Sequence, residues 1–269
     1  PRMTHSNTAV ASGNSPDATA PAFAHLNAAQ VSLLIDLRDP SLPCVLHWGA
    51  RLPDDVSAAG IALALAPPVP HGSPNLVRAH PLVPLGGQGW TLRPAVCGSR
   101  PDGSAWSPML SLAEAQVDGP SASVTLADPV AGLELSVQLR LDPHGVLTVQ
   151  QHLTNRGDTA YLLAGTVATL PVPARAGELL DLTGRWCRER APQRHPLRQG
   201  SWVRDGRRGR TGHDSPTLLV AGTPGFGFGH GEVWAVHHAW SGQSTYLAER
   251  SATGDAQLGA GERLEPGEV

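Results

Sequence analysis

The 269-residue chain contains no lysine, so all 20 of its basic residues are arginine. We interpret this one-sided usage as mutational bias in a GC-rich genome and not as a functional signal. Against 23 acidic residues the formal net charge is −3. A chain with so small a net charge has no overall positive electrostatic potential that would attract nucleic acid or an anionic membrane.

Cysteine is scarce, and long apolar runs are absent. Cys44, Cys97 and Cys187 are an odd number and show no CxxC spacing, which favours reduced thiols over a disulfide framework. No run of about 18 apolar residues occurs, so we expect no membrane span. Residues 1–24 lack the basic and apolar blocks of a signal peptide. Together these absences predict a cytoplasmic protein.

The chain divides into a short tail and one domain. Residues 1–23 carry too few apolar side chains to offset their ordering entropy, which predicts a disordered tail. Pro1-Arg2 before Met3 resembles the remnant of a cleaved tag. Residues 24–269 show no internal repeat and no sharp linker. Their apolar content can build one core without disulfides or metal.

Alternating patterns predict β-strands through most of this domain. From Leu133 to Leu141, apolar and polar residues alternate with period 2, and a turn at 142–145 leads back along 146–153. That is the pattern of an antiparallel hairpin. A further strand is expected over 160–170. Within 233–240 both alternating sets are apolar, which predicts a strand buried on both faces.

One helix is expected, near residues 54–66. Pro53-Asp54-Asp55 supplies a start signal, good helix formers follow, and Pro67-Pro68 stops the helix. Frequent turn signals with so little helix predict an all-β fold. We therefore expect a sandwich of two antiparallel sheets with one short helix.

Nine of the 20 arginines fall between Arg185 and Arg210, with only Glu189 and Asp205 against them. A polyanion site is one interpretation. No base-stacking aromatic array accompanies the charge, however, so we favour strands whose arginines pair with acids elsewhere. We expect no nucleic-acid partner.

No motif in the residues identifies an enzyme. The glycine run 225–231 lacks the lysine and spacing of a phosphate loop, and a turn explains it better. His213-Asp214-Ser215 are adjacent and cannot converge as a triad. The histidines lack zinc spacing, so we expect no metal site. Seven tryptophans are unusual beside two tyrosines; most should fill the core, and some could stack on sugar rings.

Six segments resemble, in order, the amino-terminal β-supersandwich domain of bacterial α-galactosidases of glycoside hydrolase family 36. They are VLHWGARL (45–52), PLGGQGWTLRPAVCGSRPDG (84–103), LTGRWCRERAPQRHPLRQG (182–200), RRGRTGHDSP (207–216), GEVWAVHHAWSG (231–242) and GAGERLEPGE (259–268). The family usually has Ser-Gly-Asn where this chain has Ser241-Gly242-Gln243.

This resemblance implies a parent that hydrolyses terminal α-linked galactose from sugars such as raffinose and melibiose, with retention and without a cofactor. Such chemistry uses two carboxylates, in this family on a (β/α)₈ barrel. The nucleophile lies in a Lys-Trp-Asp motif, and this chain has no lysine. The resemblance therefore implies a non-catalytic domain cut off before the barrel. It also implies that barrel as a partner and a homo-tetrameric parent.

The resemblance further implies a loop near the sugar pocket, and it assigns Trp90, Arg93 and Trp48 to substrate binding. The run 86–89 before Trp90 is prone to turn, and Pro94 keeps Arg93 extended. An indole and a planar guanidinium suit stacking on a sugar and contacts to its hydroxyls. The alternative is that Trp90 plugs one end of the sandwich while Arg93 pairs with a nearby acid.

Two other functions stay open. The chain could be a stand-alone carbohydrate-binding or adhesive sandwich with no enzyme attached. A parent within the same family could instead act on α-N-acetylgalactosamine or transfer galactose. The gene beyond Val269 separates the first case, because it encodes either a barrel with Lys-Trp-Asp or a stop.

The first prediction is that the isolated 269-residue chain does not hydrolyse an aryl α-galactoside. The physical reason is that a covalent glycosyl intermediate needs the barrel nucleophile. Turnover that survives repurification and disappears when an aspartate of this chain is substituted would contradict it.

Overall fold

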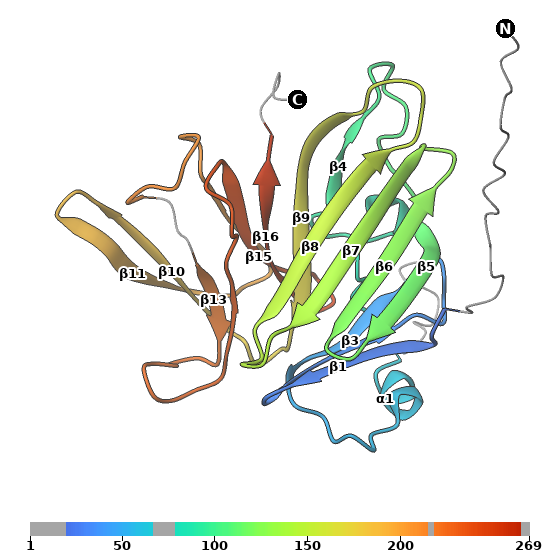
Figure 1. Ribbon diagram of the computed structural model, residues 1–269. Coiled ribbons are helices and arrows are strands. Elements are labelled where there is room, and N and C mark those ends of the chain that lie inside the picture. Colours follow the sequence, from blue (N-terminus) through green and yellow to red (C-terminus); the bar gives the residue numbers. More distant parts are fainter. Residues whose placement is uncertain (1–19, 67–78, 215–217, 265–269) are drawn as a thin grey trace, which may run out of the picture.

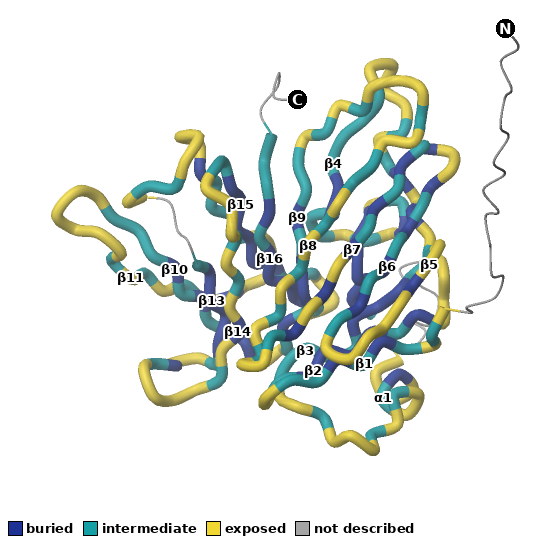
Figure 2. The backbone as a smooth tube through the Cα atoms, in the orientation of Figure 1, coloured by how far each residue is buried: buried dark blue, intermediate teal, exposed yellow. Residues whose placement is uncertain are grey.

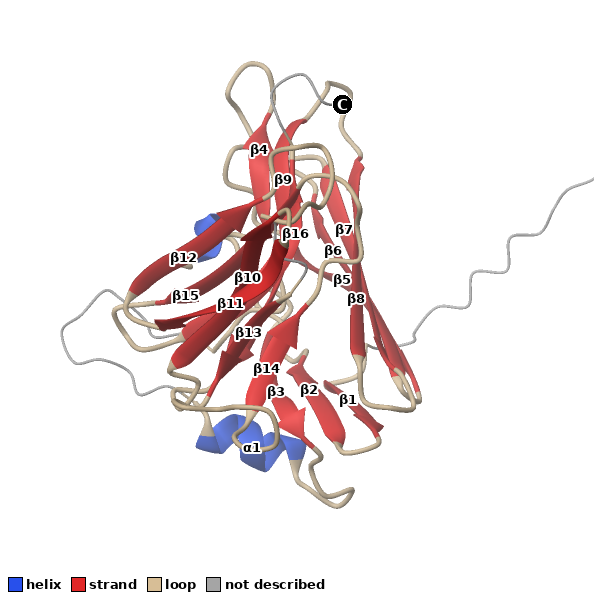
Figure 3. Cartoon of the chain, turned by 90° about the vertical axis from the view of Figure 1, so that its left-hand side faces the viewer, coloured by secondary structure: helices blue, strands red, loops and turns tan. Residues whose placement is uncertain are grey.

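The computed structural model describes residues 20–66, 79–214 and 218–264, and most of their regular structure is β-strand. All strand pairs among them are antiparallel, which confirms the predicted all-β antiparallel class. Hydrogen bonding divides the strands into four sheets, a finer division than the two expected. Figure 3 shows how little of the chain is helical.

Two of the sheets enclose the first hydrophobic core. A three-stranded sheet consists of β1 (Phe23–Ala28), β2 (Val31–Asp36) and β3 (Cys44–Ala50). The four-stranded sheet beside it consists of β5 (Ser111–Asp118), β6 (Ser121–Asp128), β7 (Leu133–Leu141) and β8 (Leu147–Asn155). Both lie on the same side of the molecule (Figure 1). Their inward apolar side chains form one cluster.

The predicted hairpin is confirmed as β7 and β8, which pair from Leu133 with Asn155 to Leu141 with Leu147. Every apolar residue of β7 is buried, while the polar residues between them are accessible. Figure 2 shows this alternation along β6 and β7. The period-2 pattern thus corresponds to one face on the core and one in solvent.

The other two sheets enclose a second core. A five-stranded sheet has the order β12 (Gly200–Asp205), β15 (Ser244–Arg250), β16 (Ala256–Arg263), β9 (Leu162–Val172) and β4 (Val96–Ser99). A four-stranded sheet has the order β11 (Arg188–Pro196), β10 (Glu178–Arg185), β13 (Leu219–Gly222) and β14 (Val233–Val236). Leu179, Leu219, Tyr246 and Leu258 are central to this core.

The two cores meet at Trp48 on β3, whose side chain packs against both clusters. Strand β9 also serves both, because Leu170 belongs to the first cluster and Val172 to the second. The two halves of the domain therefore share apolar contacts.

The prediction of a strand buried on both faces over 233–240 is wrong. Strand β14 ends at Val236, and Val233 and Ala235 are exposed while Trp234 is buried. Strand β14 is the edge of its sheet, and only the face that carries Trp234 packs on the second core. Trp240, beyond the strand, is half exposed.

The predicted helix is confirmed as α1 (Ala58–Ala64), but it begins later than expected. Ser57 caps it, because its hydroxyl accepts a hydrogen bond from the Gly60 amide at 3.0 Å. Asp54 and Asp55 lie in the preceding turn. The expected tail falls largely on residues 1–19, and the connection after α1 falls largely on 67–78, both outside the described residues. In the described part of the chain, α1 is far too short to cross a membrane.

The second prediction concerns Gly261 on β16. A Cβ there would press on the Thr166 carbonyl oxygen and lie 2.6 Å from Cα of Val167, both backbone atoms of β9. Gly261→Ala should therefore destabilise the domain by about 2 kcal/mol or more, lowering Tm by roughly 4–8 °C. Gly86→Ala is the matched control, because nothing lies within 4 Å of its Cβ position. Equal melting temperatures for the two variants would refute this account of β9 and β16.

Candidate functional site

The three predicted substrate-binding residues lie in two neighbouring places. Trp48 lines a pocket beside β3, whereas Trp90 and Arg93 lie between the 3₁₀ turn η1 (Gly86–Gln88) and β4 and do not line it. His80 connects the two places. It lines the pocket, and its ring meets the ring of Trp90 edge-on, with centroids 5.1 Å apart.

The pocket has a volume of about 460 Å³, within the range of small-ligand sites. Its aromatic and charged lining residues are His47, Trp48, His80, Arg175, Trp234 and Asp255. Among the described residues, no three His, Cys, Asp or Glu side chains group closely enough to hold a metal ion. The lining combines flat aromatic rings with polar groups.

Trp234 is fixed as part of the pocket wall. Its indole N–H donates to the Trp48 carbonyl at 3.3 Å. The Arg175 guanidinium lies 5.1 Å from the Trp234 ring centroid and is itself paired with Glu232 through two hydrogen bonds of 2.6 and 2.9 Å. The guanidinium already covers one face of this indole.

Trp90 is half buried and held by its polar edge. Its indole N–H donates to Oε1 of Gln257 at 3.2 Å. Gln257 is on β16 and fully buried, so this hydrogen bond ties the segment to the five-stranded sheet. The ring therefore has a defined place and is not free to swing.

Arg93 is anchored by its backbone, not by its side chain. Its amide donates to Oε2 of Glu249 at 2.9 Å, and its carbonyl accepts from the Gln257 amide at 3.2 Å. Within the described residues, its guanidinium has no acidic partner within ion-pair distance. Burial raises the pKa of the nearby Cys97 thiol, and the positive charge of Arg93 opposes that rise.

His80 is buried beside Trp90, and burial lowers its pKa from the ordinary 6.5 to about 4, although its contact with the Pro81 carbonyl opposes this. One ring nitrogen, Nδ1, lies 2.8 Å from the Pro81 carbonyl oxygen. The imidazole is therefore neutral at neutral pH and packs as an aromatic ring.

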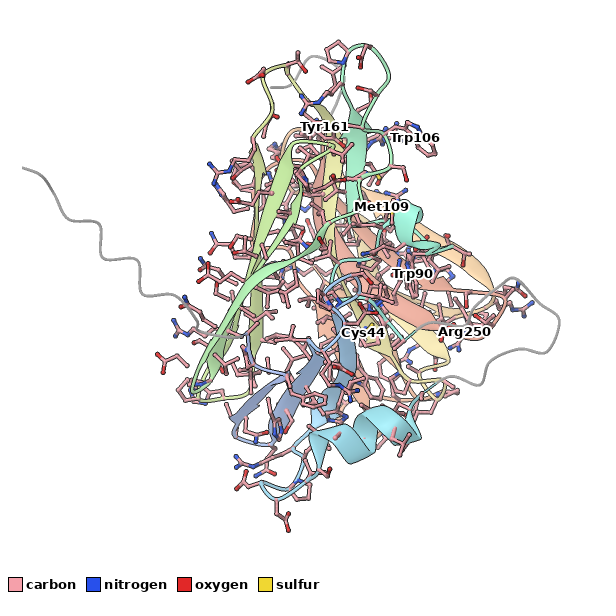
Figure 4. All side chains as sticks on the ribbon, turned by 90° about the vertical axis from the view of Figure 1, so that its right-hand side faces the viewer. Cys44, Trp90, Trp106, Met109, Tyr161 and Arg250 are labelled. Atoms are coloured by element: carbon pink, nitrogen blue, oxygen red, sulfur yellow. The ribbon has the colours of Figure 1, made fainter. Side chains whose placement is uncertain are left out.

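An exposed apolar face continues from this segment. Trp106 is 74% and Met109 60% exposed, and Gly87 of η1 lies against the Met109 side chain. Figure 4 shows Trp106 standing out from this face, with Met109 and Trp90 on the same side of the molecule. Trp106 and Met109 thus offer apolar surface to solvent on this side of the molecule.

Part of the arginine cluster pairs with acids, as the structural interpretation predicts. Four of the nine arginines pair with acids: Arg194 with Glu178, Arg204 with Asp181, Arg207 with Asp205 and Arg208 with Asp214. They tie β10, β11 and β12 to one another and to the loop that follows β12. This pairing neutralises four of the nine positive charges and leaves five without an ion pair among the described residues.

The tip of the β10–β11 ribbon contains an aromatic residue that the sequence analysis passed over. Trp186 is 75% exposed and meets His213 edge-on, with ring centroids 6.2 Å apart. The ribbon projects from the body of the molecule (Figure 1). The signal for this residue in the sequence is a tryptophan at the start of an arginine-rich stretch.

Comparison with known proteins now adds to this geometry. The profile of the glycosyl hydrolase family 36 N-terminal domain matches residues 41–269. An α-galactosidase of Escherichia coli is 34% identical over 228 residues, which are 83% of this chain and 31% of that protein. α-Galactosidase AgaA of Geobacillus stearothermophilus is 25% identical over 164 residues, 58% of this chain and 22% of that protein. The chain thus spans a third or less of these relatives.

Solved structures share the fold. A variant of Geobacillus stearothermophilus AgaA in complex with raffinose superposes with a TM-score of 0.74 at 21% identity, over 91% of this chain and 39% of that one. The α-galactosidase from Lactobacillus brevis gives 0.78 at 18% identity, over 90% and 36%.

The third prediction follows from the depressed pKa of His80. The unfolded chain protonates His80 near pH 6.5, whereas the folded chain does so only near pH 4. The contribution of neutral His80 to the free energy of unfolding is therefore complete above pH 6.5. As pH falls from 6.5 to 4, up to about 3 kcal/mol of that free energy is lost. His80→Phe should flatten that part of the stability profile, measured by urea unfolding. The exposed His152→Gln is the control. A slope in His80→Phe as steep as in the unchanged protein would contradict the assignment.

Proposed function

Because the chain belongs to glycosyl hydrolase family 36 through that family's N-terminal domain, we propose that it is the non-catalytic domain of an α-galactosidase. The parent would hydrolyse terminal α-linked galactose from oligosaccharides such as raffinose and melibiose. The observation that carries the proposal is the family match over residues 41–269. The curated relatives, both α-galactosidases, support the same reading.

In this proposal the chemistry occurs outside the 269 residues. A retaining glycosidase needs two carboxylates about 5–5.5 Å apart, one as nucleophile and one as acid and then base. Both would lie on a barrel of the same chain, at the carboxyl ends of its strands. The present domain would bind, orient and shield the sugar, which lowers the barrier by positioning.

Trp90 and Arg93 are the proposed contributors to substrate binding. The guanidinium of Arg93 has no acidic partner among the described residues, so it is available for sugar hydroxyls. Trp90 supplies a ring that its anchor holds in place. Trp48 is proposed as the third contributor, through the pocket that it lines.

The exposed face at Trp106 and Met109 is the proposed contact with the barrel. It adjoins the segment of Trp90, so the same docking would bring that segment to the sugar pocket. Homo-tetramer assembly is proposed for the parent on the family resemblance alone. The cytoplasm is its proposed location, because three cysteines without CxxC spacing favour reduced thiols over a disulfide framework.

A stand-alone carbohydrate-binding module is the second candidate. The observation in its favour is the pocket of about 460 Å³ with Trp48 and Trp234 in its wall. Sequencing the gene past Val269 separates the two functions. A barrel with a Lys-Trp-Asp motif supports the first, and a stop codon the second.

The fourth prediction tests the site in the full-length protein. Arg93→Ala removes the guanidinium but leaves both backbone hydrogen bonds of that residue, so stability should be nearly unchanged. We expect kcat/KM for an aryl α-galactoside to fall by about tenfold, near 1.4 kcal/mol. Trp90→Ala should show a similar loss, together with a lower Tm, because the hydrogen bond to Gln257 disappears.

The control is Arg208→Ala, which breaks an exposed ion pair with Asp214 instead. Normal kinetics for both Arg93→Ala and Trp90→Ala would remove these residues from the sugar site and leave them a structural role.

A further inference from the structure

A row of polar side chains crosses three strands beneath the segment 90–93. Ser201 on β12 is the cross-strand partner of Glu249 on β15, and Glu249 is the partner of Gln257 on β16. Glu249 is 4% exposed and Gln257 is fully buried. Directly opposite residues on one sheet face contact each other, so the row is continuous.

The Gln257 carboxamide engages its oxygen and both of its N–H donors in hydrogen bonds. Its oxygen accepts from the Trp90 indole at 3.2 Å. Its nitrogen donates to the Arg93 carbonyl at 3.2 Å and to Glu249 Oε2 at 2.6 Å. With one acceptor and two donors engaged, the amide has a single satisfied orientation. It therefore clips both ends of the segment to β16.

The Glu249 carboxylate completes the clip. Oε1 accepts from the Ser201 hydroxyl at 2.6 Å, and Oε2 accepts from the Arg93 amide at 2.9 Å and from Gln257. Within the described residues it forms no ion pair. A buried carboxylate without a cation is costly unless hydrogen bonds satisfy it. An apolar residue at this position would cover the sheet at a lower desolvation cost. It could not accept the directional hydrogen bond that holds the Arg93 amide.

Trp90 also contacts buried His80, whose ring packs edge-on to the indole. The indole is thus held from its polar edge by Gln257 and from its side by His80. Together these contacts leave the segment little freedom, although it contains no regular structure after η1.

We propose that Glu249 and Gln257 are positioning residues for the substrate site of the parent enzyme. They hold the Trp90 indole and the Arg93 backbone at a fixed place, so that sugar binding need not order the segment. The inference rests on the proposed function. It adds two residues that touch no sugar and act through the segment above them. Loss of the clip should raise KM, because ordering the segment then opposes binding.

The experiment compares two substitutions of Glu249 in the full-length protein. Glu249→Gln keeps an oxygen for the Arg93 amide and for Gln257, while its new N–H₂ meets Ser201, whose hydroxyl turns to accept. Glu249→Met has a similar length and no acceptor. Hydrogen exchange of the Arg93 amide reports the clip directly, and steady-state kinetics with an aryl α-galactoside report its use.

We expect Glu249→Met to speed exchange at Arg93 by about tenfold or more and to raise KM by about tenfold, with kcat within roughly twofold. Glu249→Gln should stay near the unchanged protein in both measurements. If Glu249→Met does not fold, Ser201→Ala at the edge of the row removes one donor. It should give the same pattern with a smaller amplitude, about two- to threefold.

Unchanged exchange at Arg93 in a folded Glu249→Met protein would overturn the clip itself. Faster exchange with an unchanged KM, while Arg93→Ala raises KM, would overturn the positioning role and leave the proposed function intact. Normal KM in Arg93→Ala and Trp90→Ala would overturn the site and the positioning role together, whatever the exchange shows.

Discussion

Burial of both faces of the five-stranded sheet is the constraint on which the rest of this domain depends. In β15 every residue but the last is buried. Tyr246 and Ala248 face the second core, so Leu247 and Glu249 point to the opposite face. One cover is the sheet of β10, β11, β13 and β14; the other includes the segment that carries Trp90. The second cover is irregular backbone, whose polar groups need partners, and Glu249 and Gln257 provide them.

This constraint explains what the sequence could and could not predict. The hairpin β7–β8 was predictable because its apolar face alternates cleanly with a solvated one. The sequence pattern predicts a strand buried on both faces at 233–240, where both alternating sets are apolar. The strand that is buried on both faces is Ser244–Arg250, which looks amphipathic. Its Thr245 and Glu249 are satisfied by Asp205 and Ser201, on neighbouring β12. Apolar content alone cannot reveal burial achieved by hydrogen bonding.

For the candidate site, the sequence indicates the residue types but not the residues that surround and hold them. A turn-prone run before an aromatic residue correctly marked the Trp90 segment as a loop. Its partner Gln257, however, is 167 positions away. The Trp48 carbonyl likewise accepts a hydrogen bond from the indole of Trp234, 186 positions away. Contacts at such separations depend on strand order, which local pattern does not encode. The capping of α1 by Ser57 was within reach, because a serine three residues before a glycine amide is a local signal.

The three thiols, finally, make the domain its own chemical reporter of unfolding. Cys187 is exposed at the ribbon tip, Cys97 is half buried on β4, and Cys44 is buried at the start of β3. Alkylation requires an accessible thiolate. Cys187 is therefore labelled in the native state, half-buried Cys97 more slowly because burial raises the pKa of its thiol, and buried Cys44 only after the start of β3 opens. The order in which the three cysteines are labelled therefore shows which part of the molecule unfolds first, without any engineered probe.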